Sequence, residues 1–231
     1  MPNVIGVIQA RMGSSRVPGK ALLDLAGKPL LWHMLDRMRR VNGIGRIILA
    51  TSTDPQNKAL RDFAEQNDIG FYAHNGEDDL AGRIAGAIEP EQGDFILKTG
   101  GDCPLIDPDI LQLMVDTAVQ DGTADFVSNR VQWSYPLGLS ADVLSRSAIC
   151  WANKHLTTPE ERELFALYIR DHPAQFNVIP IVHPVNLSHH IWTVDEPEDV
   201  EFMKQIFNAL YREGDVFKLQ DVLHYLQTEQ A

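Results

Sequence analysis

The first half of the chain alternates short apolar runs with longer stretches in which apolar residues recur at helical spacing. The apolar runs, which predict strands, occupy residues 4–8, 47–50 and 95–98. The helical patterns lie near residues 29–41, 56–67, 79–89 and 108–120. This alternation predicts an α/β fold built from βαβ units, with a mostly parallel sheet covered by helices on both faces. Ligands of such sheets bind beyond the carboxyl ends of the strands.

The second half of the chain has a less regular pattern. Its strand-like pieces lie around residues 139–144, 176–182 and 191–194. Its helical patterns lie around residues 159–171, 197–211 and 218–227. No linker rich in Pro, Gly or Ser divides the chain, and no internal repeat is evident. We therefore interpret residues 1–231 as one domain.

The segment directly after the first predicted strand has the composition of a phosphate-binding loop. It reads Gln9-Ala10-Arg11-Met12-Gly13-Ser14-Ser15-Arg16-Val17-Pro18-Gly19-Lys20. Its arginines, lysine, hydroxyls and glycines supply fixed positive charge, hydrogen-bond donors and backbone that a polyanion can approach closely. A solvated basic turn is the alternative that this composition leaves open.

The spacing within this loop excludes the P-loop of ATPases and related kinases. Five residues separate Gly13 from Gly19, whereas the Walker A motif has four, and Ala21 follows Lys20 where that motif has Ser or Thr. Because no hydroxyl is available there to hold magnesium, an ion would need carboxylates from elsewhere in the chain.

Charge is divided unevenly along the chain. The net charge is −12, yet residues 1–46 contain eight basic and two acidic residues, and the remainder contains twelve basic and thirty acidic residues. The acidic excess argues against nucleic acid as a partner, while the basic beginning fits a pocket for a small anion.

The cysteines and the hydropathy indicate a cellular location. Cys103 and Cys150 lack the spacing of a metal or disulfide framework, and we find neither a signal peptide nor an apolar run of membrane-spanning length. We therefore expect a cytoplasmic protein without a membrane partner.

Two acidic motifs follow predicted strands. One is Thr99-Gly100-Gly101-Asp102-Cys103-Pro104-Leu105-Ile106-Asp107-Pro108, and the other is Trp192-Thr193-Val194-Asp195-Glu196-Pro197-Glu198-Asp199. Carboxylates at strand ends suit Mg²⁺, which takes one or two of them together with water and phosphate oxygens. For Asp107 and Asp195, helix capping is the alternative, because each comes just before a proline-containing helix start.

These segments together resemble the nucleotidyltransferase family that includes SpsF and the CMP-acylneuraminate and CMP-KDO synthetases. The resemblance rests on five motifs in order: Ile8 to Lys20, Leu25-Ala26-Gly27-Lys28-Pro29-Leu30, Ala50-Thr51-Ser52, Gly100-Gly101-Asp102-Cys103-Pro104-Leu105-Ile106 and Thr193-Val194-Asp195-Glu196-Pro197-Glu198-Asp199. It implies a GT-A-like, Rossmann-type fold and the joining of CTP to an acidic sugar, which gives a CMP-sugar and pyrophosphate.

The same resemblance implies roles for particular residues. Arg11, Lys20 and Asp102 would be catalytic, and Asp102 and Asp195 would bind Mg²⁺. The nucleotide would contact Ala10, Arg11, Gly13, Ser14, Arg16, Lys20, Arg83 and Asp102. A homodimer is also expected, formed through an excursion within residues 125–185 that contains the apolar residues Trp133, Tyr135, Leu137 and Leu139.

The chain differs from the family pattern in two segments. Members commonly read Gly-Leu-Asp-Val-Glu-Val-Phe where this chain reads Gly138-Leu139-Ser140-Ala141-Asp142-Val143-Leu144, so one acid is lost and another is shortened. Members also commonly read Glu-His-Val-Thr-Pro-Tyr where this chain reads Glu163-Leu164-Phe165-Ala166-Leu167-Tyr168. These differences leave the identity of the sugar open.

Two other functions are compatible with this fold. A GT-A glycosyltransferase would use a finished nucleotide-sugar and an Asp-x-Asp metal motif, and Asp107-Pro108-Asp109 is the similar tripeptide, although its sequence favours a helix start. A non-catalytic nucleotide-binding protein is the other alternative. The joint presence of five residues counts against it: Arg11, Arg16, Lys20, Asp102 and Asp195.

Overall fold

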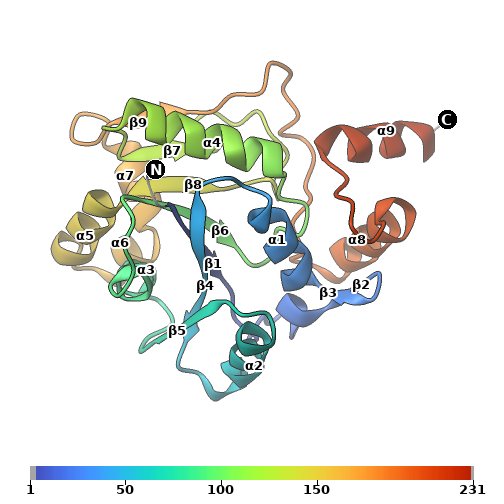
Figure 1. Ribbon diagram of the computed structural model, residues 1–231, viewed down its shortest axis with the longest axis horizontal. Coiled ribbons are helices and arrows are strands. Elements are labelled where there is room, and N and C mark those ends of the chain that lie inside the picture. The colour runs from blue at the N-terminus through green and yellow to red at the C-terminus, as the bar shows by residue number, and fades with distance from the viewer. Residues whose placement is uncertain (1–3, 230–231) are drawn as a thin grey trace.

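The computed structural model describes residues 4–229, and a seven-stranded sheet forms its centre (Figure 1). The strand order is β5-β4-β1-β6-β8-β7-β9, and β8 alone runs antiparallel to its neighbours. The strands are β1 (Val4–Gln9), β4 (Ile44–Ser52), β5 (Gly70–His74), β6 (Phe95–Gly100), β7 (Phe126–Ser128), β8 (Asp142–Ser145) and β9 (Val178–Pro180). The mostly parallel sheet predicted from the sequence is confirmed.

Helices cover both faces of this sheet and connect its strands. The α-helices are α1 (Leu30–Arg39), α2 (Lys58–Gln66), α3 (Leu80–Ile88), α4 (Pro108–Asp121), α5 (Arg146–His155), α6 (Pro159–Glu163), α7 (Phe165–Asp171), α8 (Pro197–Leu210) and α9 (Leu219–Glu229). Short 3₁₀ turns occupy Lys20–Leu22 and Pro55–Asn57, and a small hairpin joins β2 (Asp24–Leu25) to β3 (Lys28–Pro29). Among the described residues, no helix is long and apolar enough to cross a membrane.

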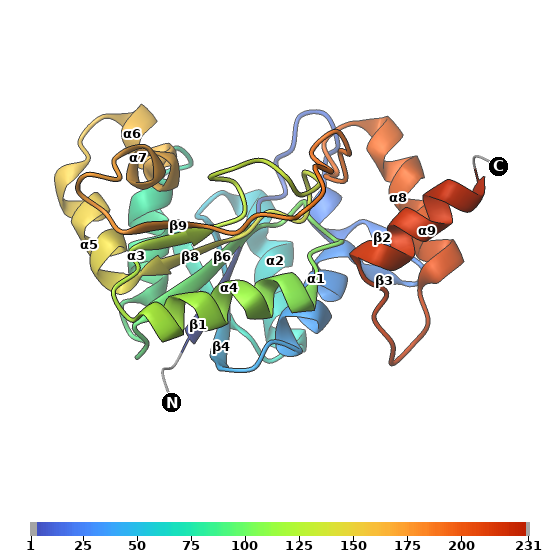
Figure 2. The ribbon, with the colours of Figure 1, turned by 90° about the horizontal axis from the view of Figure 1, so that it is seen from above.

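The apolar alternation of β1 divides the interior into two cores. Val4 and Ile8 pack with residues of α1, α2, α4, α8 and α9, whereas Ile5 and Val7 pack with residues of α3, α5 and α7 on the other face. In both ribbon views α8 and α9 lie at the opposite end of the molecule from α5, α6 and α7 (Figures 1 and 2). A strand buried on both faces must be apolar throughout, which is why β1 is a continuous apolar run.

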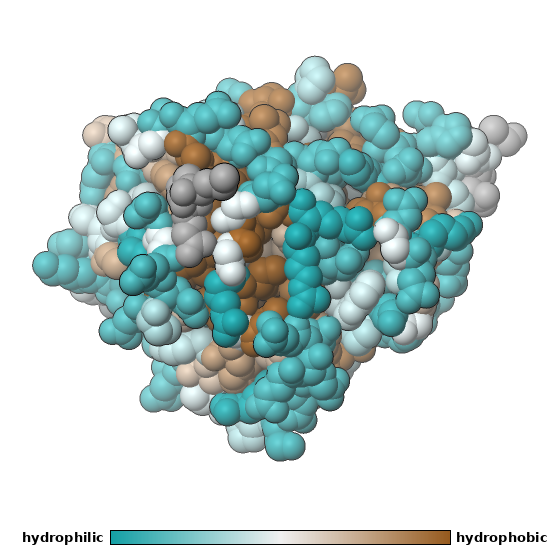
Figure 3. All heavy atoms as spheres, viewed as in Figure 1, coloured by the Kyte–Doolittle hydropathy of each residue, from teal (hydrophilic) through white to brown (hydrophobic). Residues whose placement is uncertain are grey.

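The surface agrees with this division between core and solvent. The face in Figure 3 is largely hydrophilic, and its hydrophobic residues gather near the middle, where Figure 1 shows strands between the helices. The charged side chains of α2 and α4 face solvent while their apolar sides cover the sheet, whereas His33 and Arg37 of α1 are buried.

The register of the central strands brings their carboxyl ends level with one another. Gln9 at the end of β1 pairs with Ala50 of β4 on one side and with Gly100 of β6 on the other. The loop that follows β1 and the loop that follows β6 therefore leave the sheet side by side. This edge is where an α/β sheet binds its ligands.

Helix capping explains one of the two candidate aspartates. The Asp107 carboxylate accepts hydrogen bonds from the backbone N–H groups of Asp109 and Leu219, and Pro108 occupies the first turn of α4. Asp107 is therefore a buried cap that also fastens the start of α9, as its sequence context favoured.

Several expectations about the elements were wrong or incomplete. Residues 191–194 form no strand and make only the isolated bridge between Ile191 and Leu137. The predicted helix over 159–171 is two helices, α6 and α7, which meet at Leu164. The helix α5 and the strands β5 and β7 were not predicted. The strands were missed because β5 is half-buried throughout and β7 is only three residues long, so neither shows a clear apolar alternation.

Candidate functional site

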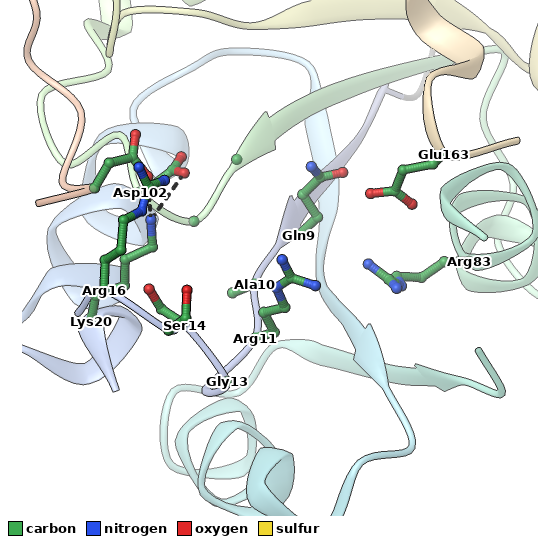
Figure 4. Close-up of a pocket in the computed structure, with 14 residues that line it drawn as sticks. Gln9, Ala10, Arg11, Gly13, Ser14, Arg16, Lys20, Arg83, Asp102 and Glu163 are labelled. Carbon is green, nitrogen blue, oxygen red and sulfur yellow. Dashed lines mark hydrogen bonds and ion pairs between the residues drawn. The ribbon is translucent and has the colours of Figure 1, made fainter. Parts of the chain in front are cut away.

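A pocket of about 280 Å³ lies at the carboxyl ends of β1 and β6 (Figure 4). All the residues that the sequence nominated for nucleotide or metal binding line it: Ala10, Arg11, Gly13, Ser14, Arg16, Lys20, Arg83, Asp102 and Asp195. Five further residues complete its wall: Gln9, Ser15, Gly100, Gly101 and Glu163. The fold therefore brings together five segments that are far apart in the sequence: 9–20, Arg83, 100–102, Glu163 and Asp195.

A glycine lets the two loops of this pocket approach closely. The backbone N–H of Gly101 donates to the Gln9 carbonyl over 2.7 Å, and a Cβ on Gly101 would lie 2.6 Å from the Cβ of Ala10. Any larger residue would push the loops apart. Asp102 is held beside the 9–20 loop for this reason.

The 9–20 loop is held in shape by its own hydrogen bonds and by one buried amide. The Met12 N–H donates to Oδ1 of Asn57, the Gly19 N–H donates to the Met12 carbonyl, and the Val17 N–H donates to Oγ of Ser14. The Ser14 hydroxyl thus accepts a bond inside the loop, and its own proton is still available to a ligand.

Lys20 joins the two candidate metal ligands. Its Nζ lies 2.8 Å from Oδ1 of Asp195 and 3.3 Å from Oδ2 of Asp102, and it also donates to the Val194 carbonyl over 2.7 Å. Partial burial acts to raise the pKa of Asp195, but the hydrogen bond and charge of Lys20 outweigh it and hold that pKa below its ordinary value. Asp195 is therefore ionised at neutral pH.

Asp195 reaches the pocket from an extended segment and not from a sheet strand, which corrects the expectation for residues 191–194. The Val194 N–H donates to the Asp102 carbonyl, and the Trp192 N–H donates to the Leu137 carbonyl. Gly138 makes this docking possible, because a Cβ there would lie 2.4 Å from the Trp192 carbonyl carbon. Glu196 is the residue that caps α8, so Asp195 is not the helix cap that the sequence left open.

The arginines of the loop are also paired with carboxylates. Arg16 lies 2.5 Å from Glu196, and Arg11 lies 3.6 Å from Glu77. Both pairs are exposed, and exposed ion pairs contribute little stability, so phosphate oxygens can replace the carboxylates at small cost. The cations of this loop are therefore exchangeable.

The far end of the pocket holds a buried guanidinium. Nη2 of Arg83 donates to the carbonyls of Gly76 and Glu77, while its Nε has no hydrogen-bond partner among the described residues. Burial lowers the pKa of Arg83, although Glu163 acts in the opposite direction. Oε2 of Glu163 and Oε1 of Gln9 likewise lack partners in the described part of the chain.

A second pocket of about 270 Å³ adjoins the first and shares Gln9, Gly100, Asp102 and Asp195 with it. Its wall contains a buried ionic cluster in which Nζ of Lys98 lies 3.3 Å from Oδ2 of Asp142 and Nη2 of Arg130 lies 2.8 Å from the same oxygen. Burial acts to raise the pKa of Asp142, but Arg130, Lys98 and Ser128 together hold it below its ordinary value. The cluster contains two basic side chains and one carboxylate, and burial lowers the pKa of Lys98 while Asp142 acts to raise it.

Asp102 and Asp195 are the residues that could hold a magnesium ion. Asp102 and Asp195 converge on one ammonium group, and each is about one third exposed, so both can turn toward an ion. No group of three or more His, Cys, Asp or Glu residues gathers as a metal cluster within residues 4–229. Two carboxylates completed by water and phosphate oxygens are the usual ligands of Mg²⁺ at nucleotides.

The Asp-x-Asp tripeptide of the glycosyltransferase alternative does not lie in either pocket. Asp107 caps α4, and the exposed Asp109 pairs with Lys218 over 2.7 Å. The structure therefore offers no metal motif of that kind at this tripeptide.

Most of the chain, including most of this site, matches a known protein family. Residues 5–191 match the profile of the Cytidylyltransferase family. The chain belongs to this family. The cytidylyltransferase profile spans β1, the 9–20 loop, Asp102 and the segment up to Ile191, so it includes most of both pockets.

Individual relatives agree with the family match. The spore coat polysaccharide biosynthesis protein SpsF of Bacillus subtilis is 28% identical over 227 residues, covering 94% of this chain and 91% of that protein. The 3-deoxy-manno-octulosonate cytidylyltransferase of Anaeromyxobacter sp. strain K is 36% identical over 115 residues, covering 50% and 47%. The structure of a cytidylyltransferase from Leptospira borgpetersenii superposes with a TM-score of 0.92 at 26% identity, covering 100% and 96%.

Sequence reasoning did not nominate several residues of these pockets. Lys98 carried a signal, because a lysine directly after the apolar run Phe95-Ile96-Leu97, within the same predicted strand, predicts a buried, paired charge. Glu163 carried a weaker one, because it matches the first residue of a family segment of which only the first and last residues, Glu163 and Tyr168, agree. Gln9 begins the 9–20 loop motif but was not itself nominated, and Arg130 carried no signal that local pattern could reveal.

Proposed function

We propose that this protein is a Mg²⁺-dependent cytidylyltransferase that joins CTP to an acidic sugar, giving a CMP-sugar and pyrophosphate for surface polysaccharide or glycan biosynthesis. One observation carries the proposal: Asp102 and Asp195 meet at Lys20, between a pocket lined by exchangeable cations and a second pocket lined by a cationic cluster. This arrangement suits a reaction between an anionic nucleotide and an anionic acceptor. The family supports the nucleotide as CTP.

The loop residues would bind the triphosphate by exchanging partners. Arg11 and Arg16 would release Glu77 and Glu196 and donate to phosphate oxygens, and Lys20 would stabilise the departing pyrophosphate. When bound, Mg²⁺ would neutralise phosphate charge and polarise the α-phosphoryl oxygen. Asp102 and Asp195 would hold that ion, which frees Lys20 from both carboxylates.

The second pocket would hold the sugar beside the α-phosphate. A sugar hydroxyl oxygen would form a bond to the α-phosphorus as the bond to the β-phosphate oxygen breaks, so positioning in line is the main requirement. The family pattern has Asp and Glu at the positions of Ser140 and Asp142. In this chain the one carboxylate that is present, Asp142, is neutralised by Lys98 and Arg130. The excess positive charge favours a carboxylate-bearing sugar. One relative acts on 3-deoxy-manno-octulosonate, which is such a sugar.

A panel of nucleotides tests this function. The purified protein would be incubated with Mg²⁺, a mixture of acidic sugars and each of CTP, UTP, ATP and GTP in turn, and pyrophosphate release would be followed. We expect release with CTP and acidic sugars and none with neutral sugars or without Mg²⁺. Release that is independent of the sugar, or that occurs with other nucleotides equally, would contradict the proposal.

We also propose that two copies of the chain associate. Trp133, Val182, Val185 and Ile191 are exposed, and hydrogen bonds from Leu187 and His183 to Ser134 place their segments side by side. Tyr135 and Leu139 are buried, so these two residues of the expected interface belong to the core instead. A cluster of exposed apolar residues fits an interface between copies. Light scattering at micromolar concentration should give twice the monomer mass, and Trp133→Glu should lower it.

A further inference from the structure

Arg16 is a cation of the 9–20 loop that can change its partner. Its side chain is 59% exposed, and among the described residues its guanidinium hydrogen-bonds to Glu196 alone. Lys20, by contrast, is 14% exposed and donates to three acceptors. Figure 4 shows Arg16 beside Lys20, across the pocket from Arg83. The Arg16 guanidinium can therefore move between a partner at the rim and a ligand in the pocket.

Glu196 lies next to the nucleotide pocket without forming part of its wall. It follows Asp195 directly in the chain, but only Asp195 lines the pocket. The backbone N–H groups of Asp195 and Glu196 donate to Oδ2 of Asp199 over 2.9 Å and 2.8 Å, which fastens this segment to the first turn of α8. The Glu196 side chain therefore leaves the backbone at a fixed point within reach of Arg16.

The pair between Arg16 and Glu196 competes with phosphate for the guanidinium. A ligand that needs Arg16 must first displace the carboxylate, and its apparent affinity falls with the fraction of the protein in which Arg16 is free. An exposed ion pair is weak, so this competition lowers the affinity only about twofold to fivefold. Such an effect leaves phosphate binding possible and makes the bound phosphate easier to release.

We propose that Glu196 is a positioning residue for product release: it takes back Arg16 as pyrophosphate leaves the 9–20 loop. This proposal rests on the proposed function, in which that loop binds the triphosphate. Pyrophosphate keeps the contacts that the loop makes to the β- and γ-phosphates, so cations without a competing carboxylate would retain it after the transfer. Product release limits the turnover of many enzymes, and a carboxylate beside the site lowers that limit.

The substitution Glu196→Gln tests this assignment, because glutamine keeps the length of the side chain and removes its charge. Binding of pyrophosphate would be measured by calorimetry in the presence of Mg²⁺. We expect Glu196→Gln to bind pyrophosphate about twofold to fivefold more tightly than the wild type. Glu198→Gln is the matched control, since Glu198 is exposed in the first turn of α8 and forms no ion pair within residues 4–229. Its affinity should stay close to that of the wild type.

A second background separates competition for Arg16 from a general effect of charge. In Arg16→Ala there is no guanidinium to release, so adding Glu196→Gln should change pyrophosphate affinity no more than Glu198→Gln does. A gain that persists in this background would overturn the proposal. So would pyrophosphate binding in Glu196→Gln that equals that of Glu198→Gln or is weaker than that of the wild type. The proposed function stands in all these cases, and it fails itself if the wild type binds neither CTP nor pyrophosphate.

Discussion

Each of the two pockets has a lysine–carboxylate cluster in its wall, and the two clusters differ in burial. In the first, the Lys20 side chain is 14% exposed and its partners Asp102 and Asp195 are 32% and 36% exposed. In the second, the Lys98 and Asp142 side chains are 7% and 2% exposed. Water and ligands can compete for the first cluster, whereas separating the second would leave the buried charges of Lys98 and Asp142 unpaired. Similar residues therefore form an exchangeable binding site in one place and a permanent scaffold in the other.

The largest effect is expected at the exchangeable cluster. Asp102→Asn and Asp195→Asn should each lower Mg²⁺-dependent pyrophosphate release by roughly a hundredfold or more, because the ion they hold supplies several kcal/mol of charge stabilisation. The free energy of unfolding should change by less than about 1 kcal/mol, since the lost pairs are partly exposed. Asp109→Asn is the control, because its carboxylate is exposed and lies outside both pockets. Near-normal turnover in either variant would make that residue a simple loop carboxylate.

The buried cluster should respond through stability. Asp142→Asn leaves Lys98 and Arg130 without their shared counter-charge, and breaking such a buried pair costs about 3 to 5 kcal/mol. Chemical denaturation of the variant and the wild type measures this difference. A loss below about 1 kcal/mol would mean that water reaches the cluster, which would remove the contrast between the two regions.

Binding affinity separates the cations of the loop from those elsewhere. Arg16→Ala and Lys20→Ala should each weaken CTP binding about tenfold to hundredfold, because a charge-assisted contact contributes roughly 1.5 to 3 kcal/mol. Calorimetry measures the affinity, and Lys58→Ala, which removes an exposed lysine outside the pocket, should bind CTP as the wild type does. Unchanged affinity in both loop variants would exclude the 9–20 loop as the triphosphate site.

The smallest expected effect is a pH dependence. The folded-state pKa of Asp142 is held below its ordinary value of 3.8, so its ionised form stabilises the fold fully at neutral pH. This contribution is lost as the pH falls below 3.8 and through the lower folded-state value. The unfolding free energy of the wild type should therefore fall more steeply in acid than that of Asp142→Asn. Parallel pH curves would show that Asp142 is not ionised in the fold.

The sequence by itself determined most of the first half of the fold, although not β5, and one side of the site. The strands β1, β4 and β6 are buried on both faces and must therefore be apolar, so the sequence shows them as continuous apolar runs. The position of the ligand-binding edge, beyond the carboxyl ends of these strands, followed from that prediction. The 9–20 loop could be predicted because its cations and glycines lie in one short segment. The capping role of Asp107 could be predicted because a cap contacts only its neighbours in the chain.

Only the tertiary structure decided which distant groups meet. Asp195 comes to Lys20 through a docked extended segment with no strand pattern of its own, and Gly138 permits that docking through a contact that no local spacing encodes. Glu163 faces Arg83 because Arg162 and Asp79 join two helices eighty residues apart. Local propensity depends on neighbours in the chain, whereas ion pairs, burial and partnerless polar atoms depend on which segments the packed core holds together.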